Sequence, residues 1–378
     1  MKKALENSVL VLIIYLLILF ISFGTLLLYW LFRPNRSDIN ENLKMKVWAA
    51  VEDGWHNSNT DMTYWKGKFY LIHACSPYHF GINICKLKLW SSKNAKRWNF
   101  LRIFQIKGED IRDPKFQVLD DKLVLYALKN KTFNPEPYDS VMSTSLDGDN
   151  WTEWSEISNQ EGWLFWRPKT HDGNTWYVPV YWRDHGKSKL LKSKDGTSWN
   201  DWSVIYEGLK NDETAIEFFP DGRLLCTARL EGSGNFLGDQ RGCTLISVTD
   251  KPYKNWKRKM SYLTRLDGPV LFSYDGKVYA VGRYQPKRGF MTKQGSIFAR
   301  KRTSIFLIEE DRLVWLSDLP SAGDTTYGGV VLKDGYLYVC YYTNDVKKDF
   351  PWVLGMISQS DIMMAQINLQ RLKHITPL

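Results

Sequence analysis

One pattern recurs six times along the chain: a tight turn, usually Asp-Gly, followed by a strand of alternating apolar residues. The copies are KGKFYLIHA (66–74), DDKLVLYAL (120–128), DGNTWYVPVYW (172–182), DGRLLCTARL (221–230), DGKVYAVGRY (275–284) and DGYLYVCYY (334–342). Asp-Gly between apolar runs predicts a β-hairpin, because the favoured turn requires a positive φ that glycine adopts freely. Six units of about 50 residues, each containing such a hairpin, predict a six-bladed β-propeller.

A second turn motif follows the hairpin in four of these units. Two copies are regular, SLDGDNW (145–151) and SKDGTSW (193–199), and two are looser, SSKNAKRW (91–98) and SVTDKPYKNW (247–256). In such a turn the Asp side chain accepts backbone N–H groups, the glycine supplies the unusual φ, and the Trp packs over the turn. These turns resemble the Asp-boxes of sialidases and related propellers. The resemblance implies that they stabilise the fold and take no part in catalysis.

The two ends of the chain are expected to close the ring. Residues 45–51 (MKVWAAV) have the pattern of a strand, as do residues 360–369 (SDIMMAQINL). We expect the first of these to join the last blade beside the second. The predicted fold class is therefore all-β, with a six-bladed propeller over residues 46–378. The polar residues 33–45 are expected to form a linker, and residues 1–32 a membrane anchor.

The anchor is predicted from a long apolar run. Residues 8–32 contain no charged side chain, and 25 residues in a helix at about 1.5 Å each exceed the roughly 30 Å hydrocarbon core of a bilayer. A cleaved signal peptide is the alternative, but the run is long and no A-x-A cleavage site closes it. We expect an uncleaved single-pass anchor. Because a large folded remainder is more often exported, we expect the propeller on the extracytoplasmic side.

Charge and hydropathy exclude two broad classes of protein. The chain has 51 Lys and Arg against 41 Asp and Glu, but the basic residues are interspersed rather than gathered in a stripe, so we expect no nucleic-acid partner. A mean hydropathy of −0.37 with one long apolar run excludes a polytopic membrane protein. The modest positive surplus favours an anionic surface or an acidic substrate. We expect the chain to act as a monomer.

The cysteines and histidines do not predict a metal site. The chain has five Cys and six His, and no C-x-x-C motif, so we expect no zinc site, no other metal and no cofactor. Cys75 with Cys85, and Cys226 with Cys243, could each bridge neighbouring strands if the domain is exported. Five buried thiols are the equal alternative.

In a propeller, the start of each innermost strand and the end of the next strand face the same mouth of the central channel. The predicted inner strands start near Asp61, Arg112, Asp113, Arg167, Asp212, Glu213, Asp267, Thr326 and Tyr327, and the second strands end near His73, Arg183, Arg229, Arg283 and Tyr342. Ionisable groups thus recur at one position of the repeat. This recurrence indicates a polar site at the mouth, with salt bridges between blades as the alternative.

Three stretches resemble the fourth, fifth and sixth blades of sialidases. DETAIEFFPDGRLLCTAR supplies Glu213 on an inner strand and Arg229 at the end of the next strand. RLDGPVLFSYDGKVYAVGR supplies Arg283, and GDTTYGGVVLKDGYLYVCYY supplies Tyr327. The resemblance covers residues 45–378, and it implies an exo-sialidase-like glycoside hydrolase that acts on extracellular glycans.

The resemblance also implies a role for each of these residues. Tyr327 would be the nucleophile and Glu213 the base that withdraws its proton, while Arg229 and Arg283 would bind the carboxylate of the sugar through charge-assisted hydrogen bonds. A neutral tyrosine suits such a substrate, because a carboxylate nucleophile would be repelled by the sugar's own carboxylate. Sialidases depart in this way from the two-carboxylate scheme of other glycosidases.

The first blade departs from the family pattern in two places. Sialidases open it with an Arg-Ile-Pro motif, whereas NSNTDMTYW (57–65) has Asp61 and no Arg. Arg112, in the similar IRDP of the next blade, is the candidate replacement, and Arg167 is a further candidate for substrate binding. The family's acidic Asp is also missing from CSPYHFGINIC (75–85). Asp61, Asp113 or His79 would then serve as the general acid.

These departures keep two other functions open. A degenerate propeller that binds carbohydrate without cleaving it would keep the polar mouth and lack the acid. A scaffold for protein partners would instead carry an apolar or aromatic patch on the rims of its blades. The fold alone does not decide among these functions.

Overall fold

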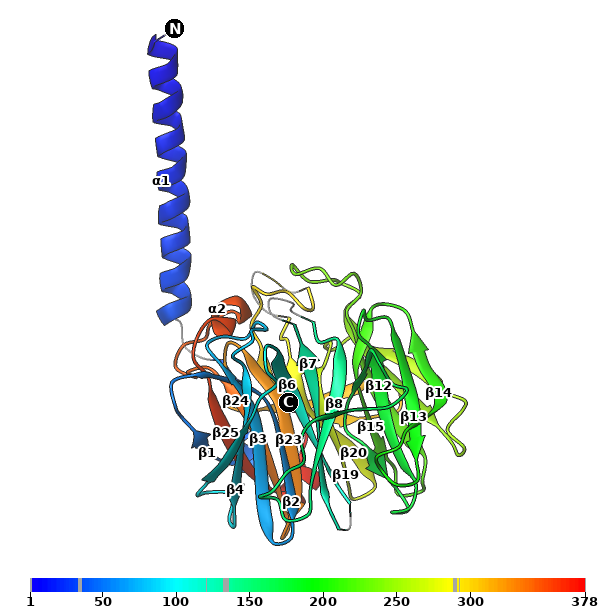
Figure 1. Cartoon of the computed structure of the whole chain (residues 1–378). Helices are drawn as coiled ribbons and strands as arrows, with labels where there is room; N and C mark the ends of the chain where they lie inside the picture. Colours follow the sequence, from blue (N-terminus) through cyan, green and yellow to red (C-terminus); the bar gives the residue numbers. More distant parts are fainter. Residues whose placement is uncertain are drawn as a thin grey trace.

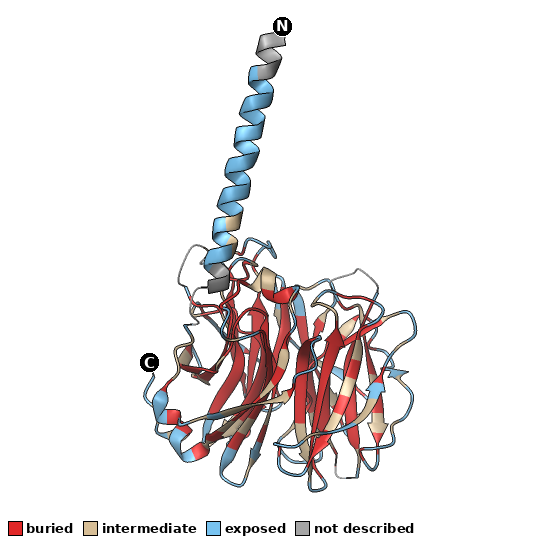
Figure 2. Cartoon of the chain, turned by 90° about the vertical axis from the view of Figure 1, so that its left-hand side faces the viewer, coloured by how far each residue is buried: buried red, intermediate tan, exposed pale blue. Residues whose placement is uncertain are grey.

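The computed structural model describes residues 2–32, 36–119, 121–131, 136–287, 291 and 293–377. A long helix, α1 (Lys2–Phe32), stands off a β-propeller (Figure 1). Its segment Asn7–Tyr29 is long and apolar enough to cross a membrane and is not buried by the rest of the chain. Figure 2 shows this contrast between the exposed helix and the buried strands.

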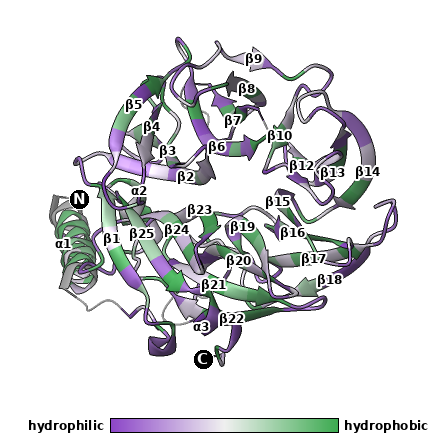
Figure 3. Ribbon diagram, turned by 90° about the horizontal axis from the view of Figure 1, so that it is seen from below, coloured by the Kyte–Doolittle hydropathy of each residue, from purple (hydrophilic) through white to green (hydrophobic). Residues whose placement is uncertain are grey.

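The described residues form six β-sheets, which are arranged as a ring around a central channel (Figure 3). Blade one comprises β2 (His56–Trp65), β3 (Lys68–Ser76), β4 (Lys86–Ser92) and β5 (Asn99–Phe104). Blade two comprises β6 (Asp110–Val118), β7 (Leu123–Asn130), β8 (Asp139–Ser145) and β9 (Ser155–Glu156). Blade three comprises β10 (Trp163–Phe165), β11 (Lys169–Thr170), β12 (Trp176–Trp182), β13 (Lys187–Ser193) and β14 (Asn200–Glu207).

The remaining blades repeat the same antiparallel order. Blade four comprises β15 (Asn211–Phe218), β16 (Leu224–Leu230), β17 (Cys243–Thr249) and β18 (Lys257–Ser261). Blade five comprises β19 (Asp267–Tyr274), β20 (Lys277–Tyr284), β21 (Arg302–Ile308) and β22 (Leu313–Asp318). Blade six comprises β23 (Thr325–Lys333), β24 (Tyr336–Thr343), β25 (Asp361–Asn368) and β1 (Lys46–Val51), with the short helices α2 (Trp352–Met356) and α3 (Leu369–Lys373) beside it. The predicted six-bladed fold is confirmed.

The ring closes through its first and last strands. β1 pairs antiparallel with β25, so that Val47 lies opposite Ala365, and β25 continues onto β24 and β23. This confirms the predicted closure. Pairing the two ends of the chain in one blade leaves no gap in the ring and ties the last blade to the start of the propeller.

The blades are held together by apolar side chains between sheets and by well-bonded turns. Leu71, Leu89 and Leu125 are fully buried, as expected for strands that pack against neighbouring blades on both faces. In the turn 145–151, Asp147 accepts the N–H groups of Asp149 and Asn150 at 2.8 and 2.7 Å. Hydrogen bonds from the backbone and side chain of Asn150, together with that from the N–H of Asp149, hold the pKa of Asp147 below its usual range.

Residues 36–45, expected to be part of a linker, lie against the propeller. The N–H of Asp38 donates to Asp318 at 2.9 Å and that of Asn40 donates to Ser317 at 3.0 Å. The following turn of 3-10 helix, η1 (Glu41–Leu43), buries Leu43 completely. Residues 33–35 of the expected linker lie outside the described residues.

The five cysteines Cys75, Cys85, Cys226, Cys243 and Cys340 are all buried as free thiols. Cys226 lies opposite Ser247 and Cys243 opposite Leu230, so these two are at opposite ends of the β16–β17 pair. The sequence left disulfides and buried thiols as equal alternatives, and the structure has the buried thiols.

Candidate active site at the mouth of the propeller

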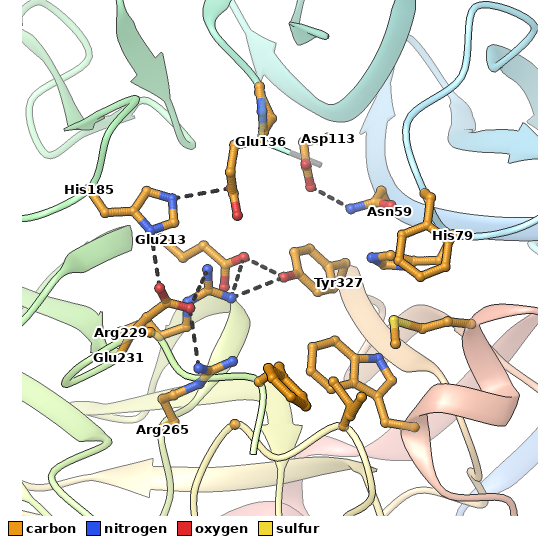
Figure 4. Close-up of a pocket in the computed structure, with 18 of the residues that line it drawn as sticks. Asn59, His79, Asp113, Glu136, His185, Glu213, Arg229, Glu231, Arg265 and Tyr327 are labelled. Atoms are coloured by element: carbon orange, nitrogen blue, oxygen red, sulfur yellow. Dashed lines mark hydrogen bonds and ion pairs between the residues drawn. The ribbon is translucent and has the colours of Figure 1, made fainter. Parts of the chain in front are cut away.

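A pocket of about 330 Å³ opens at the mouth where the inner strands start. This volume lies near the lower end of the range for small-molecule sites. Figure 4 shows charged side chains from several blades converging on it. The charged and titratable groups that line it are His79, Arg112, Asp113, Glu136, Tyr181, His185, Glu213, Arg229, Glu231, Arg265 and Tyr327.

Tyr327, Glu213 and Arg229 form one hydrogen-bonded group in this pocket. The hydroxyl of Tyr327 donates to Oε1 of Glu213. Nη1 of Arg229 lies 2.9 Å from the same carboxylate oxygen and donates to the Tyr327 hydroxyl at 3.4 Å. The N–H of Gly268 donates to Oε2 of Glu213 at 2.6 Å. Three donors thus hold the Glu213 carboxyl group in place: the Tyr327 hydroxyl, the Arg229 guanidinium and the N–H of Gly268.

The backbone conformation near Tyr327 explains how its phenol side chain reaches the pocket. Thr326 and Tyr327 have φ values of 104° and 38°, and the pairing of β23 with β24 shifts register between Thr326 and Gly329. Such a bulge re-aims a side chain at the start of a strand. Gly268 makes room for it, because a β-carbon there would lie 2.7 Å from the ring of Tyr327. Tyr327 is 8% exposed.

Burial sets the protonation behaviour of this pair. Removal from water raises the pKa of Glu213 to about 7; Arg229 opposes the rise, and the carboxylates of Asp212 and Asp267 add to it. Burial and the nearby Glu213 raise the pKa of Tyr327 well above its usual range. Tyr327 is therefore a neutral phenol at physiological pH, and the group placed to take its proton is Glu213.

Among the described residues, three arginines line the pocket, and carboxylates orient each of them. Arg229 donates through Nε to Asp212 at 2.7 Å. Arg265 donates through Nε to Asp267 at 2.7 Å and lies 3.2 Å from Glu231. Arg112 donates to its near neighbour Asp110 at 2.8 and 2.6 Å. Guanidinium groups fixed in this way can present their remaining edges to an anionic ligand.

His185 lies among three carboxylates in the wall of the pocket. Its Nδ1 lies 3.3 Å from Asp212 and 3.1 Å from Glu231, and its Nε2 lies 3.3 Å from Glu136. Burial alone would lower the pKa of His185, but these carboxylates raise it to about 10. The imidazole is therefore a cation that cross-links the walls of the pocket.

Solved sialidases share the fold of this chain. The chain aligns with the phage phi92 endosialidase at a TM-score of 0.65 and 11% identity, covering 86% of this chain and 69% of that one. It aligns with Trypanosoma rangeli sialidase in complex with sialic acid at 0.61 and 15%, covering 91% and 59%. A mutant of NanB sialidase from Streptococcus pneumoniae gives 0.59 and 11%, covering 89% and 71%. The chain has the sialidase fold.

The likeness to sialidases is one of structure and not of sequence. No family model matches the chain, and no curated protein matches it in sequence. The chain spans about 60% of the length of the trypanosomal sialidases that it resembles. The sialidase fold is thus established by the arrangement of the strands, at 11–15% identity.

The sialidase fold brings five of the predicted site residues to the pocket and leaves three outside its lining. Those that line it are Arg112, Asp113, Glu213, Arg229 and Tyr327. Asp113 accepts a hydrogen bond from Asn59 at 2.6 Å. His79, the third candidate for the general acid, also lines the pocket.

Asp61 and Arg167 instead pair with each other inside the channel. Nη2 of Arg167 lies 3.1 Å from Oδ1 of Asp61 and donates to the carbonyl oxygen of Gly328 at 2.7 Å. Asp61 was expected at the start of its strand, but β2 begins at His56. Five residues at about 3.3 Å each carry Asp61 well below the mouth.

Arg283, expected to bind the substrate carboxylate, lies beneath Tyr327. It is 2% exposed and donates to Asp324 at 2.9 Å and to the carbonyl oxygen of Thr325 at 2.9 Å. Its guanidinium lies 5.1 Å from the centre of the Tyr327 ring. Arg283 therefore supports the nucleophile candidate from below, while Arg265, just before β19, supplies the pocket arginine of blade five.

Four further residues of the pocket were not predicted from the sequence: Arg265, His185, Glu136 and Glu231. Two of them carried a usable signal. Glu231 directly follows β16 and His185 follows β12 closely, which is the repeat position already identified as facing the mouth. Arg265 precedes β19 by two residues, so only the exact start of that strand would have revealed it.

Two groups of side chains bring metal-ligating atoms together: His56, His79 and Asp324, and His185, Asp212 and Glu231. In the first, Arg283 already donates to Asp324. In the second, Arg229 is paired with both carboxylates. A divalent cation would stand beside a buried guanidinium in either group. We therefore interpret both as ion-pair networks that shape the site.

Proposed function

We propose that the chain is a glycoside hydrolase of the exo-sialidase type, with Tyr327 as nucleophile and Glu213 as its base. The observation that carries this proposal is the buried hydrogen bond from the Tyr327 hydroxyl to Glu213, with Arg229 on both groups. A phenol bonded to a carboxylate at the floor of a pocket is an activated nucleophile of the kind that acts on a sugar carrying its own negative charge.

The proposed reaction proceeds in two displacements. In the first, Oη of Tyr327 forms a bond to the anomeric carbon while its proton passes to Glu213, and the bond from that carbon to the leaving oxygen breaks. A general acid protonates the leaving oxygen, and Asp113 is the candidate for this role because it lines the pocket across from Arg265 (Figure 4). In the second, water attacks the anomeric carbon and passes a proton to the deprotonated general acid, while the bond from that carbon to Oη of Tyr327 breaks and Glu213 returns the phenolic proton to Tyr327.

We propose that Arg229, Arg265 and Arg112 bind the carboxylate of the substrate. All three line the pocket, and each is held by its own carboxylate partner, so little side-chain freedom is lost when a ligand binds. In this proposal Arg265 takes the place that the resemblance gave to Arg283. Arg112 replaces the first-blade arginine that NSNTDMTYW lacks, as expected from the sequence. We further propose that the chain acts from a membrane through α1, with the propeller on the extracytoplasmic side.

The test compares Tyr327→Phe with the wild-type chain on an aryl α-glycoside of N-acetylneuraminic acid. We expect wild type to release the aryl group and the variant to lose at least about 1,000-fold in kcat. Tyr341→Phe is the matched control, because this buried tyrosine on β24 donates to the carbonyl oxygen of Pro320 at 3.0 Å and lies outside the pocket lining. Full activity in Tyr327→Phe would refute the assignment of the nucleophile.

A non-catalytic carbohydrate-binding propeller is the second candidate. It is favoured by one observation: the guanidinium groups of Arg229, Arg265 and Arg112 are already paired with acidic groups in the fold. A wild-type chain that binds immobilised glycans but releases no aryl group from any glycoside would establish this second function in place of the first.

A further inference from the structure

A set of large apolar side chains is exposed around the mouth of the propeller. We call this set the apolar rim, and it comprises Phe80, Ile84, Phe236, Leu237, Phe298 and Ile357. Each lies on a loop that follows a strand running towards the mouth, or next to α2. Phe236 is 62% exposed. Soluble proteins seldom gather exposed residues of this size on one face unless that face contacts another apolar phase.

Backbone hydrogen bonds join the loops of the rim into one surface. The N–H of Ile297 donates to the carbonyl oxygen of Phe236 at 3.0 Å, and that of Val353 donates to Ile297 at 2.8 Å. On the other side of α2, the N–H of His79 donates to Met356 at 2.8 Å. The rim is thus a continuous band along one side of the mouth and not a scatter of unrelated side chains.

The chain also enters the propeller at this face. Ser37 donates to the carbonyl oxygen of Ser321, and the N–H of Asp38 donates to Asp318. Both partners lie where β22 ends and the chain turns towards β23, at the mouth. Figures 1 and 2 both show α1 rising from this side. The candidate span ends at Tyr29, and eight residues to Ser37 reach at most about 28 Å.

From these observations we infer that the mouth face rests on the bilayer that α1 spans, with the apolar rim inserted at the level of the headgroups. The inference rests on α1 remaining as the anchor. A short tether and an apolar surface on the same face reinforce each other, because the tether holds the rim close to the bilayer and the rim gains stability by burying apolar area in the interface. The pocket then opens onto the headgroup layer.

The position of the pocket on the bilayer also indicates a class of substrate, an inference that rests on the proposed function. A pocket that opens towards its own bilayer receives glycans that project from lipids of that membrane. The substrate class is therefore an acidic glycan on a glycolipid in the same bilayer, in preference to a soluble glycoprotein.

The depth of the rim is measured on the full-length chain reconstituted in phosphatidylcholine vesicles. Phe236→Cys and Leu146→Cys are each labelled with the fluorophore NBD; the native cysteines are buried. Leu146 is the matched control, because it is 67% exposed in the turn after β8, at the end of the propeller away from the mouth. We expect nitroxide-labelled lipids to quench the label at position 236 at least several-fold more than at 146. Equal quenching at the two positions overturns the inference.

A second experiment follows the substrate. Leu237→Ser with Phe298→Ser, two rim residues outside the pocket lining, should slow hydrolysis of a sialylated glycolipid in the same vesicles at least about tenfold, and should leave hydrolysis of the soluble aryl glycoside unchanged. Equal effects on both substrates would overturn the glycolipid assignment. If the wild-type chain hydrolyses neither substrate, the proposed function fails, while the quenching measurement still decides whether the rim lies on the membrane.

Discussion

Tyr327 on β23 and Glu213 on β15 are 114 residues apart in the sequence, yet the hydroxyl of one donates to the carboxylate of the other. Both are buried, and Nη1 of Arg229 lies 2.9 Å from the oxygen that accepts this hydrogen bond. Proton transfer between them requires no movement of either side chain. Activity, its pH dependence and the stability of the fold should therefore all respond to this contact and to the charges around it.

Glu213→Gln should retain the fold and lose catalysis. The amide cannot take the phenolic proton, so we expect kcat to fall by about 100- to 10,000-fold, with a small change in KM. Steady-state kinetics on the aryl glycoside measure both. Glu217→Gln serves as the control, because Glu217 lies on the same strand and pairs with Lys169 at 2.7 Å, outside the pocket lining. A loss of kcat in the control as large as in Glu213→Gln would argue against a specific role for Glu213.

The activity should rise with pH through the neutral range. Glu213 accepts a proton only when it is ionised, and burial raises its pKa to about 7. We therefore expect kcat/KM, which reports the free enzyme, to increase from pH 5 to pH 8 with a midpoint near 7. A profile without an ascending limb in this range would contradict the assignment of Glu213 as the base.

The same pKa shift predicts an opposite trend in stability. The folded chain holds the proton of Glu213 up to about pH 7, whereas an unfolded glutamate releases it near about pH 4.3. Between these values the folded state binds more protons, so the contribution of Glu213 to the free energy of unfolding falls as pH rises. The difference in Tm between Glu213→Gln and wild type should therefore grow in favour of the variant from pH 4 to pH 8.

The arginines of blade five should separate into a binding residue and a structural one. Arg265 lines the pocket, so Arg265→Gln should raise KM by about 10- to 100-fold through the loss of a charged hydrogen bond. Arg283→Gln should leave KM unchanged and lower the free energy of unfolding by about 3–5 kcal/mol, because it removes a guanidinium partner of the buried Asp324. Kinetics and thermal unfolding of both variants test this, and an exchange of the two effects would restore Arg283 as the binding residue.

Blade five also shows how far the sequence could predict the site. The turn-and-strand repeat determined the number of blades and the closure by β1, because both depend on periodic apolar residues. It also brought Tyr327, Glu213 and Arg229 together, since each lies at the same repeat position. It could not choose between Arg265 and Arg283, which occur in one short stretch. That choice depends on where β19 begins and on the space beneath Tyr327, and neither is encoded in a local pattern.

Two side chains of the pocket are candidates for the general acid. Asp113 and His79 both line the pocket, but Nδ1 of His79 lies 2.6 Å from the buried Asp324, whereas Asp113 accepts from the neutral amide of Asn59 and lies at a longer 3.8 Å from Nζ of Lys115. The acid matters most when the leaving group is a poor one, because an aryl oxide departs without protonation. Asp113→Asn should therefore slow the cleavage of a disaccharide-linked sugar by at least about 100-fold and that of the aryl glycoside much less. His79→Gln should slow both substrates to the same extent, and the reverse pattern would assign the acid to His79.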